Sequence, residues 1–582
     1  MNRQDIIPFC FGKDPDLDAW FTSFFLENHI DHFAYPMKAG SREQVEFMVY
    51  LPENERYYPC SDHMFASIMS RSSKDFVKNR YAKAHDKIIN LIDELIVADE
   101  ENAFLKSLIQ IKYNHEIQIG LIIPSRLEKR LFKIFVSRTH IEDPCSKHKR
   151  ERNLKARRIL DSGAFKAALD HTDETFSCTR ESSLEEIKEK IETLELRRLC
   201  TLMGAESLWR SNNLVKPEKY DFLSIFNTPI TGNGFDVFSG KLRRKKRRIL
   251  WLSNEAGEII TDISMIRHLA REGHTVILSV KDESFFTKVS IVDVHNDPSI
   301  SSSLENASFI HGKNLSKNSL VNMLKSNKNI FVVSDGTREN LNLLFVSTTF
   351  SRLFKEVDFV VSRGHGQKKR LFDTHFEFTQ DIFSITKTVD GQVCIDFKKK
   401  AENAVKFSHE ALEKKAGNII DSMRQARREK MTVMFYSGIV GSIPGKIDVA
   451  KKIMSVFIDH LQKESNNLFI INPSLYYEPG MDADDLMYMW EIVQRSGFID
   501  IWRFQTADDI SKSFALMNEK VPPEWIGKDA TYSTGCTKEI KIAKDVQKRF
   551  PEMQIIGPSI ERFMRRHEYG VGSMYDKTLT RS

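Results

Sequence analysis

The stretch ILWLSNEAGEIITD, residues 249–262, is the part of the chain that decides the fold. Its apolar start, residues 249–252, leads into a polar turn that contains a glycine, and an amphipathic helical pattern follows the turn. This order delivers side-chain oxygens to the carboxyl end of a strand, which is the edge where open α/β sheets bind ligands. We therefore predict an α/β fold with a ligand site at this turn.

Further apolar runs follow, and helical patterns separate them. The runs are residues 275–280, 329–335, 358–364 and 381–388. Such alternation favours a parallel sheet with helices on both faces, which is a three-layer α/β domain. One run ends in SRGHGQKKR, residues 362–370, where glycines and bases follow the strand. The two turns together suggest a phosphate-handling pocket, although each alone also fits an ordinary connection between a strand and a helix.

The rest of the chain divides by pattern into three further regions. Residues 1–225 are mainly helical in pattern, and Asp14 before Pro15 is typical of a helix start. We expect the central α/β domain at 226–398. A charged helical connector at 399–430 is expected to lead into an additional Rossmann-like α/β domain at 431–582.

Composition indicates a globular protein of the cytoplasm. The chain has 582 residues, of which 41% are hydrophobic and 29% charged, and its net charge is +6. The seven cysteines are scattered without a CxxC pair, which fits a reducing compartment and makes a zinc site unlikely on spacing. The first residues lack a signal-peptide core, and no apolar run approaches the roughly 18 residues that a membrane span needs. We therefore expect no membrane partner.

At this point a family resemblance becomes visible. SNEAGEIITDISMIRHLAREGHTVILSVKD, residues 253–282, resembles the signature of the damage-control phosphatase family, also described as acidic-residue methyltransferase-like, which begins roughly DNAGE. VSIVDV at 289–294 is similar to that family's ATLEDA segment, and FVVSDGT at 331–337 to the strand that follows it. SRGHGQ at 362–367 is similar to its KGQGN. The resemblance covers residues 249 to about 398.

The resemblance implies an α/β domain with a helical N-terminal portion that binds one divalent metal and hydrolyses phosphomonoesters of small metabolites. The family's Asp-Asn ligand pair falls on Asn254 and Glu255, or on Ser253 and Asn254 if one residue is inserted. Its later Asp falls at Lys288, and a protonated lysine cannot ligate a metal. Asp293 is one of the nearby carboxylates that could help to rebuild a site for Mg, Mn, Co or Ni.

The resemblance also suggests roles at the second turn. Arg363 stands where the family has Lys and would hold the phosphate, together with the backbone amides of Gly364 and Gly366 and the ammonium of Lys288. Glu255 and His365 are the candidate catalytic residues, His365 as general acid or base. The alternative for His365 is a solvated turn residue.

Two functions of different kinds remain open. The first is a metal-dependent phosphatase-like protein with an altered metal site, acting on a small phosphorylated metabolite. The second is a non-catalytic phospho-metabolite-binding or regulatory protein, in which the Lys288 ammonium stands where the metal charge would be. A third, nucleic-acid binding through KLRRKKRR at 241–248, is less favoured because a charge run is usually a solvated face. The oligomeric state stays open, a homo-oligomer included.

Overall fold

The computed structural model describes residues 9–70, 74–172, 183–210, 216–443, 445–465 and 467–568. The chain divides into two compact units, residues 1–315 with 322–404, and residues 316–321 with 405–582. The second unit therefore includes a short segment taken from inside the first. The domain boundaries expected at 225, 398 and 430 stay predictions.

The N-terminal part of the first unit is helical, as expected. Asp14 caps its first helix, because its side chain accepts hydrogen bonds from the amides of Asp16 and Leu17. The helices are α1 Pro15–Glu27, α2 Arg42–Glu46, α3 Asp62–Ser70, α4 Lys74–Leu95, α5 Asp99–Ile119, α6 Pro124–Thr139, α7 Ser146–Asp161, α8 Gly163–Leu169, α9 Leu184–Leu202, α10 Ser207–Arg210 and α11 Phe222–Phe226.

The first unit is built on an eight-stranded sheet with the order β2-β10-β9-β7-β3-β4-β6-β5. The strands are β2 Ile230–Thr231, β3 Arg248–Leu252, β4 Thr275–Val280, β5 Ser308–Ile310, β6 Ile330–Ser334, β7 Phe359–Arg363, β9 Asp381–Lys387 and β10 Val393–Lys398. From β9 to β5 all neighbours are parallel, whereas β10 is antiparallel to β9. The α/β fold class is therefore confirmed, with an antiparallel addition at one side of the sheet.

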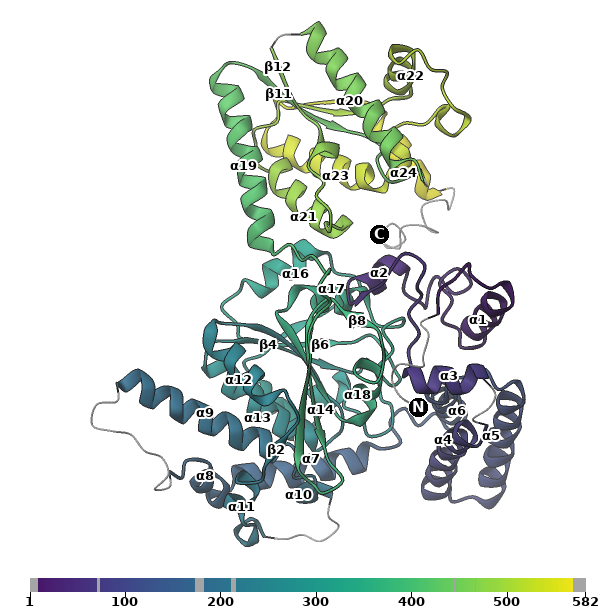
Figure 1. Ribbon diagram of the computed structural model, residues 1–582, viewed down its shortest axis with the longest axis vertical. Coiled ribbons are helices and arrows are strands. Elements are labelled where there is room, and N and C mark those ends of the chain that lie inside the picture. Colours follow the sequence, from purple (N-terminus) through teal and green to yellow (C-terminus); the bar gives the residue numbers. More distant parts are fainter. Residues whose placement is uncertain are drawn as a thin grey trace. The chain divides into compact units, whose positions relative to one another are not determined.

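Helices cover both faces of this sheet, which gives the three layers. They are α12 Phe235–Arg244, α13 Glu258–Arg271, α14 Ile291–Asn296, α15 Pro298–Ser301, α17 Thr348–Glu356 and α18 His365–Leu371. Figure 1 shows α13 and α18 on opposite sides of the strands. Trp251 of β3 is fully buried in the core between the sheet and α13. Burial of this strand on both faces explains its continuous apolar pattern.

A network of charged side chains joins the N-terminal region to the loop after α18. The short strands β1 Val49–Tyr50 and β8 Glu377–Phe378 pair in antiparallel fashion nearby. His375 Nδ1 lies 2.9 Å from Asp62 Oδ1, and its Nε2 lies 2.5 Å from Glu55 Oε1. Burial lowers the pKa of His375, but its hydrogen bonds and charge interactions with the two carboxylates outweigh burial and raise it to about 9.

Because of this network, we expect the free energy of unfolding to depend on pH. The folded pKa of His375 is about 9 against an ordinary value of 6.5, so its stabilising contribution is fully present below about pH 6.5 and is lost as pH rises through 9. We expect the difference in unfolding free energy between the wild type and His375→Gln to shrink from pH 6 to pH 10. Urea denaturation at several pH values measures it. A difference that stays constant across this range would contradict the prediction.

The second unit contains the expected C-terminal α/β fold. Its four strands are all parallel in the order β12-β11-β13-β14, and they are β11 Thr432–Ser437, β12 Leu468–Ile471, β13 Ile501–Phe504 and β14 Gln554–Ile556. Its helices are α19 His409–Arg428, α20 Ile447–Glu464, α21 Ala483–Gln494, α22 Ala507–Leu516, α23 Thr534–Arg549 and α24 Ile560–Glu568. This arrangement is a small Rossmann-like sheet.

The segment 316–321 is part of this second unit through α16, Lys317–Leu324. Lys317 Nζ lies 2.7 Å from Asp485 Oδ1, and both side chains are buried. Val321 packs in the hydrophobic core of the unit together with Leu412 and Ala416 of α19. The segment is therefore tied to the second unit by both charge and apolar packing.

Two expectations about the environment concern cysteines and membranes. The six described cysteines are free, and Cys178 lies outside the described residues. Among the described helices, none has the length and apolar character that crossing a membrane requires.

Candidate active site

The turn after β3 places Asn254 and Glu255 at the carboxyl edge of the sheet. Asn254 is buried, and its Nδ2 donates to Glu258 Oε2 over 3.1 Å. The hydroxyl of Ser253 instead donates to the carbonyl of Ser279 over 2.8 Å. Asn254 belongs to both possible ligand pairs. Of its two neighbours, only Glu255 carries a charge.

Lys288 occupies the space between these two side chains. Its Nζ donates to Asn254 Oδ1 and lies 2.8 Å from Glu255 Oε1, while Thr287 donates to Glu255 Oε2. A backbone bridge between residues 255 and 288 holds the two segments together. Burial alone would raise the pKa of Glu255, but the Lys288 charge, its hydrogen bond and that from Thr287 lower it to about 2. The Glu255 carboxylate is therefore ionised at neutral pH.

Asp293 does not join this cluster. Its carboxylate caps α14 by accepting hydrogen bonds from the amide and hydroxyl of Ser290, at 2.8 and 2.7 Å. Lys149 of α7 lies 2.7 Å from the same carboxylate oxygen. Its oxygens serve a helix cap and an ion pair, so the expectation that Asp293 helps to rebuild a metal site stays a prediction without a supporting contact.

Arg363 also lies away from its expected position. Its guanidinium is buried, donates from Nε to Asp262 Oδ1 over 2.7 Å and reaches the carbonyl of Met203 at 3.3 Å. Burial raises the pKa of Asp262 to about 6, and the Arg363 charge opposes that rise. Arg363 therefore forms a buried ion pair with α13, and its expected role in holding phosphate stays a prediction without a supporting contact.

The two predicted turns nevertheless lie against each other. Gly364 has φ +81°, and a Cβ there would lie 2.5 Å from Asn254 Nδ2, so the close approach requires glycine. Gln367, which the sequence did not indicate, donates to the carbonyl of Ser253 over 2.8 Å. The amide of Gly364 already donates to Ile385 at 3.0 Å. Its expected role toward phosphate, and that of Gly366 in the first turn of α18, stay predictions.

His365 lies at the surface rather than inside this cluster. Its Nε2 donates to the carbonyl of Lys387 over 2.8 Å, and the side chain is exposed. This position agrees with a solvated turn residue and offers no contact with Glu255. A catalytic role of His365 stays a prediction without a supporting contact.

Other carboxylates at this edge are also neutralised by lysines. Lys281, directly after β4, lies 2.5 Å from Asp335, directly after β6, and both are buried. Burial raises the pKa of Asp335, and the Lys281 charge opposes the rise. Lys313 pairs with Asp282 at 2.5 Å. The edge therefore carries its own positive charges.

These donors do not fit a divalent metal. Within the part of the chain that the structure describes, no group of three or more His, Cys, Asp or Glu side chains could hold a metal ion. The two best oxygen donors, from Asn254 and Glu255, already bind the ammonium of Lys288. Divalent ions of this kind require several free oxygen ligands, so this donor set is incomplete.

The basic run at 241–248 is largely paired with acids. The pairs are Lys241 with Asp381 at 2.7 Å, Arg243 with Glu189 at 2.9 Å, and Arg247 and Lys245 with Asp358 at 3.7 and 3.8 Å. Cations that are already paired attract a phosphate backbone less strongly. The contacts therefore do not favour nucleic-acid binding.

The family model of the damage-control phosphatase ARMT1-like domain matches residues 60–405. The chain belongs to this family. The match begins near the end of the loop before α3 and ends where the first unit ends, so the family domain includes most of the N-terminal helices and the whole eight-stranded sheet. Membership supports a phosphatase-like function of the metal-dependent kind.

One solved structure that resembles the damage-control phosphatase-like chain is a DUF89 family protein from Pyrococcus horikoshii. The two are 15% identical, the match covers 54% of this chain and 96% of that one, and the TM-score is 0.38. Among curated proteins, none matches the chain.

Proposed function

We propose that this damage-control phosphatase-like protein binds a small phosphorylated metabolite without metal-dependent hydrolysis, because Lys288 takes the place of the metal. One observation carries the proposal: the Lys288 ammonium contacts Asn254 Oδ1 and lies 2.8 Å from Glu255 Oε1. An ammonium supplies a positive charge to these oxygens. It has no coordination position for a water molecule or a phosphoryl oxygen.

The missing coordination position matters for the chemistry. Metal-dependent hydrolysis needs the ion to polarise a phosphoryl oxygen and to lower the pKa of a bound water. A metal could bind here only after displacing Lys288, which would leave the lysine without its partner in a largely buried position. Removing one partner from a buried ion pair is strongly unfavourable. The site therefore favours the regulatory or binding role over catalysis.

The metal-dependent phosphatase remains the second candidate, and family membership favours it. In that case Asn254 and Glu255 would bind Mg, Mn, Co or Ni once Lys288 moved aside. Metal analysis of the purified protein, with p-nitrophenyl phosphate turnover in each of these four ions, separates the two. Turnover by the wild type that is lost in Glu255→Ala would refute our proposal. A cytoplasmic location and a homo-oligomer stay predictions.

A gain of metal binding is the sharpest expected result. Lys288→Asp removes the ammonium and adds a carboxylate next to Asn254 and Glu255, so we expect affinity for Mn²⁺ to rise at least roughly 10-fold over the wild type. Equilibrium dialysis with Mn²⁺ measures this affinity. Lys288→Met is the matched control, since it removes the charge without adding a ligand. Equal Mn²⁺ binding by all three proteins would show that Lys288 does not govern the site.

A further inference from the structure

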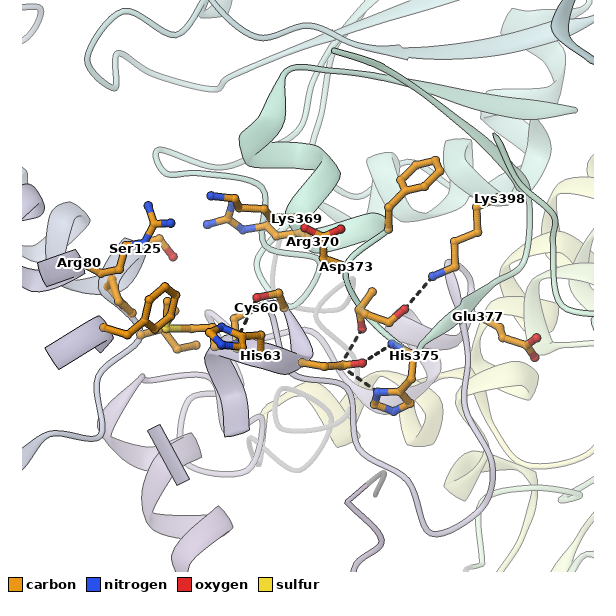
Figure 2. A pocket seen from close by; sticks show the side chains of 18 of the residues that line it. Cys60, His63, Arg80, Ser125, Lys369, Arg370, Asp373, His375, Glu377 and Lys398 are labelled. Atoms are coloured by element: carbon orange, nitrogen blue, oxygen red, sulfur yellow. Dashed lines mark hydrogen bonds and ion pairs between the residues drawn. The ribbon is translucent and has the colours of Figure 1, made fainter. Parts of the chain in front are cut away.

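A large pocket lies in the first unit, apart from the cluster around Lys288. Its volume is about 870 Å³, which is within the usual range for small-molecule sites. It is lined by residues of α3 and α4, the start of α6, the end of α18 with the loop that follows, and the end of β10 (Figure 2). Asn254, Glu255 and Lys288 are not part of its lining.

Basic side chains gather on one side of this pocket. Arg80, Ser125, Lys369 and Arg370 lie on the side away from His375 (Figure 2). Burial lowers the pKa of Lys369, and the charges of Arg80 and Arg370 lower it further, while Asp373 acts in the opposite direction. These cations repel one another, and an anion between them would relieve the repulsion.

Arg370 is the most telling of these residues. Its Nη1 donates to the carbonyl of Gly366 over 2.7 Å, whereas its Nε is inaccessible to solvent and has no hydrogen-bond partner. Burial lowers its pKa, whereas charge interactions with Tyr57, Cys60, Glu128 and Glu339 act in the opposite direction. Among the described residues, no carboxylate forms an ion pair with Arg370. Arg370 is half-buried, so its guanidinium is partly removed from water without a carboxylate in contact, and a bound anion would be favourable there.

The start of α6 faces the same pocket. Its N-cap residue Ile123 offers no side-chain cap, and its first turn contains no acidic residue. Both Ile123 and Ser125 line the pocket. Pro124 has no N–H, and the amides of Ile123 and Arg126 already donate to Asn28 and Ile123, so the Ser125 amide and the positive end of the helix dipole are what add to the attraction for an anion.

Asp62, which lines the pocket beside His375, does not neutralise these cations. Asp62 is bound by His375, Thr374 and Tyr58 in the network that joins the N-terminal region to the sheet. Burial raises the pKa of Asp62, but the hydrogen bonds and the charge of His375 bring this pKa below its ordinary value. Asp62 is therefore already paired with a cation of its own.

The remaining lining suits an organic body attached to the anion. Phe76, Phe372 and Phe397 line the pocket, and the guanidinium carbon of Arg80 lies 5.5 Å from the centre of the Phe76 ring. Aromatic faces and arginine planes both accept a flat ring by stacking. Inorganic phosphate alone would leave most of this volume to water.

We propose that this pocket binds an organic phosphomonoester with a ring-containing body, with its phosphate between Arg80, Lys369 and Arg370 at the start of α6. The proposal rests on the proposed function, since it assigns a place and a chemical class to the phosphorylated ligand. A phosphate dianion matches the charge of these three side chains and would accept charge-assisted hydrogen bonds from them.

Calorimetric titration of the full chain in EDTA tests the proposal with AMP, adenosine and inorganic phosphate as probes. We expect AMP to bind more tightly than either of the other two. Arg370→Gln and Arg80→Gln should each weaken AMP binding at least roughly 10-fold, which is the loss of one good charge-assisted contact. Arg158→Gln is the control, because it removes the same charge from an exposed position on α7 that does not line the pocket.

The outcomes separate the two proposals. Absence of AMP binding, equal binding of adenosine and AMP, or wild-type affinity in both pocket variants would overturn the assignment of the pocket. If Arg370→Gln fails to fold by circular dichroism, Arg80→Gln decides alone, since Arg80 is partly exposed. Metal-dependent turnover in the earlier experiment would count against the proposed function only, because EDTA removes metal from this one.

Discussion

Replacing Arg363 by alanine is expected to lower the free energy of unfolding by about 3–5 kcal/mol, because it leaves the fully buried Asp262 carboxylate without its counter-charge. The pKa of Asp262 is already about 6, and it rises further once the Arg363 charge no longer lowers it. Protonation of Asp262 therefore limits the loss of stability at low pH. The destabilisation should therefore be larger at pH 8 than at pH 5. Urea denaturation of the full chain at both pH values measures it.

The matched control is Arg243→Ala. Arg243 also pairs with a carboxylate, that of Glu189 at 2.9 Å, but both side chains are about half exposed. Exposed pairs contribute about 0–1 kcal/mol, so this variant should unfold almost as the wild type does. If Arg363→Ala were as stable as Arg243→Ala but bound phosphate more weakly, Arg363 would hold phosphate. The stabilising role of its ion pair with Asp262 would then be wrong.

A second large loss is expected from Gly257→Ala, in the turn between β3 and α13. Gly257 has φ +87°, and an added Cβ would lie 2.2 Å from Cδ1 of the buried Trp209 indole. Backbone strain contributes about 1–3 kcal/mol and overpacking about 1–3 kcal/mol more. Denaturation in urea gives the loss. Because this turn carries Asn254 and Glu255, the variant should also disturb the contact with Lys288.

Gly366→Ala is the comparison for this substitution. Gly366 lies in the first turn of α18, and the nearest atom to an added Cβ is Arg370 Nη1 at 4.0 Å. Alanine is favoured over glycine in a helix, so stability should be unchanged or slightly higher. Equal losses in the two variants would mean that the turn at Gly257 is not built as described.

The strands that the sequence predicted are those whose apolar runs are long and buried on both faces. β3, β4, β6, β7 and β9 each have five to seven residues and stand out for this reason. β5 and β2 were missed because three and two residues are too few for a pattern. β10 was also missed, because it begins with alternating buried and partly exposed residues and lacks a continuous apolar run. It pairs with β9 through a short hairpin, which requires antiparallel strands.

At the candidate site, the local sequence predicted which turns meet but not what their charged residues do. The substitution at Lys288 indicated an ammonium in place of a metal, and the contact with Asn254 and Glu255 agrees with that hypothesis. The partners of Arg363 and Asp293 come from positions 101 and 144 residues away in the chain. Such partners depend on tertiary packing, which periodicity and short motifs do not report.

The short segment 316–321 has a consequence for dividing this protein. Because it belongs to the C-terminal unit, the chain passes from one unit to the other at 315, again at 321 and finally at 404. A gene cut after residue 404 would separate Lys317 from Asp485 and Val321 from Leu412. A fragment that ends at residue 404 would therefore carry residues 316–321 without the unit in which they pack. We expect the two units to be retained together when the gene recombines.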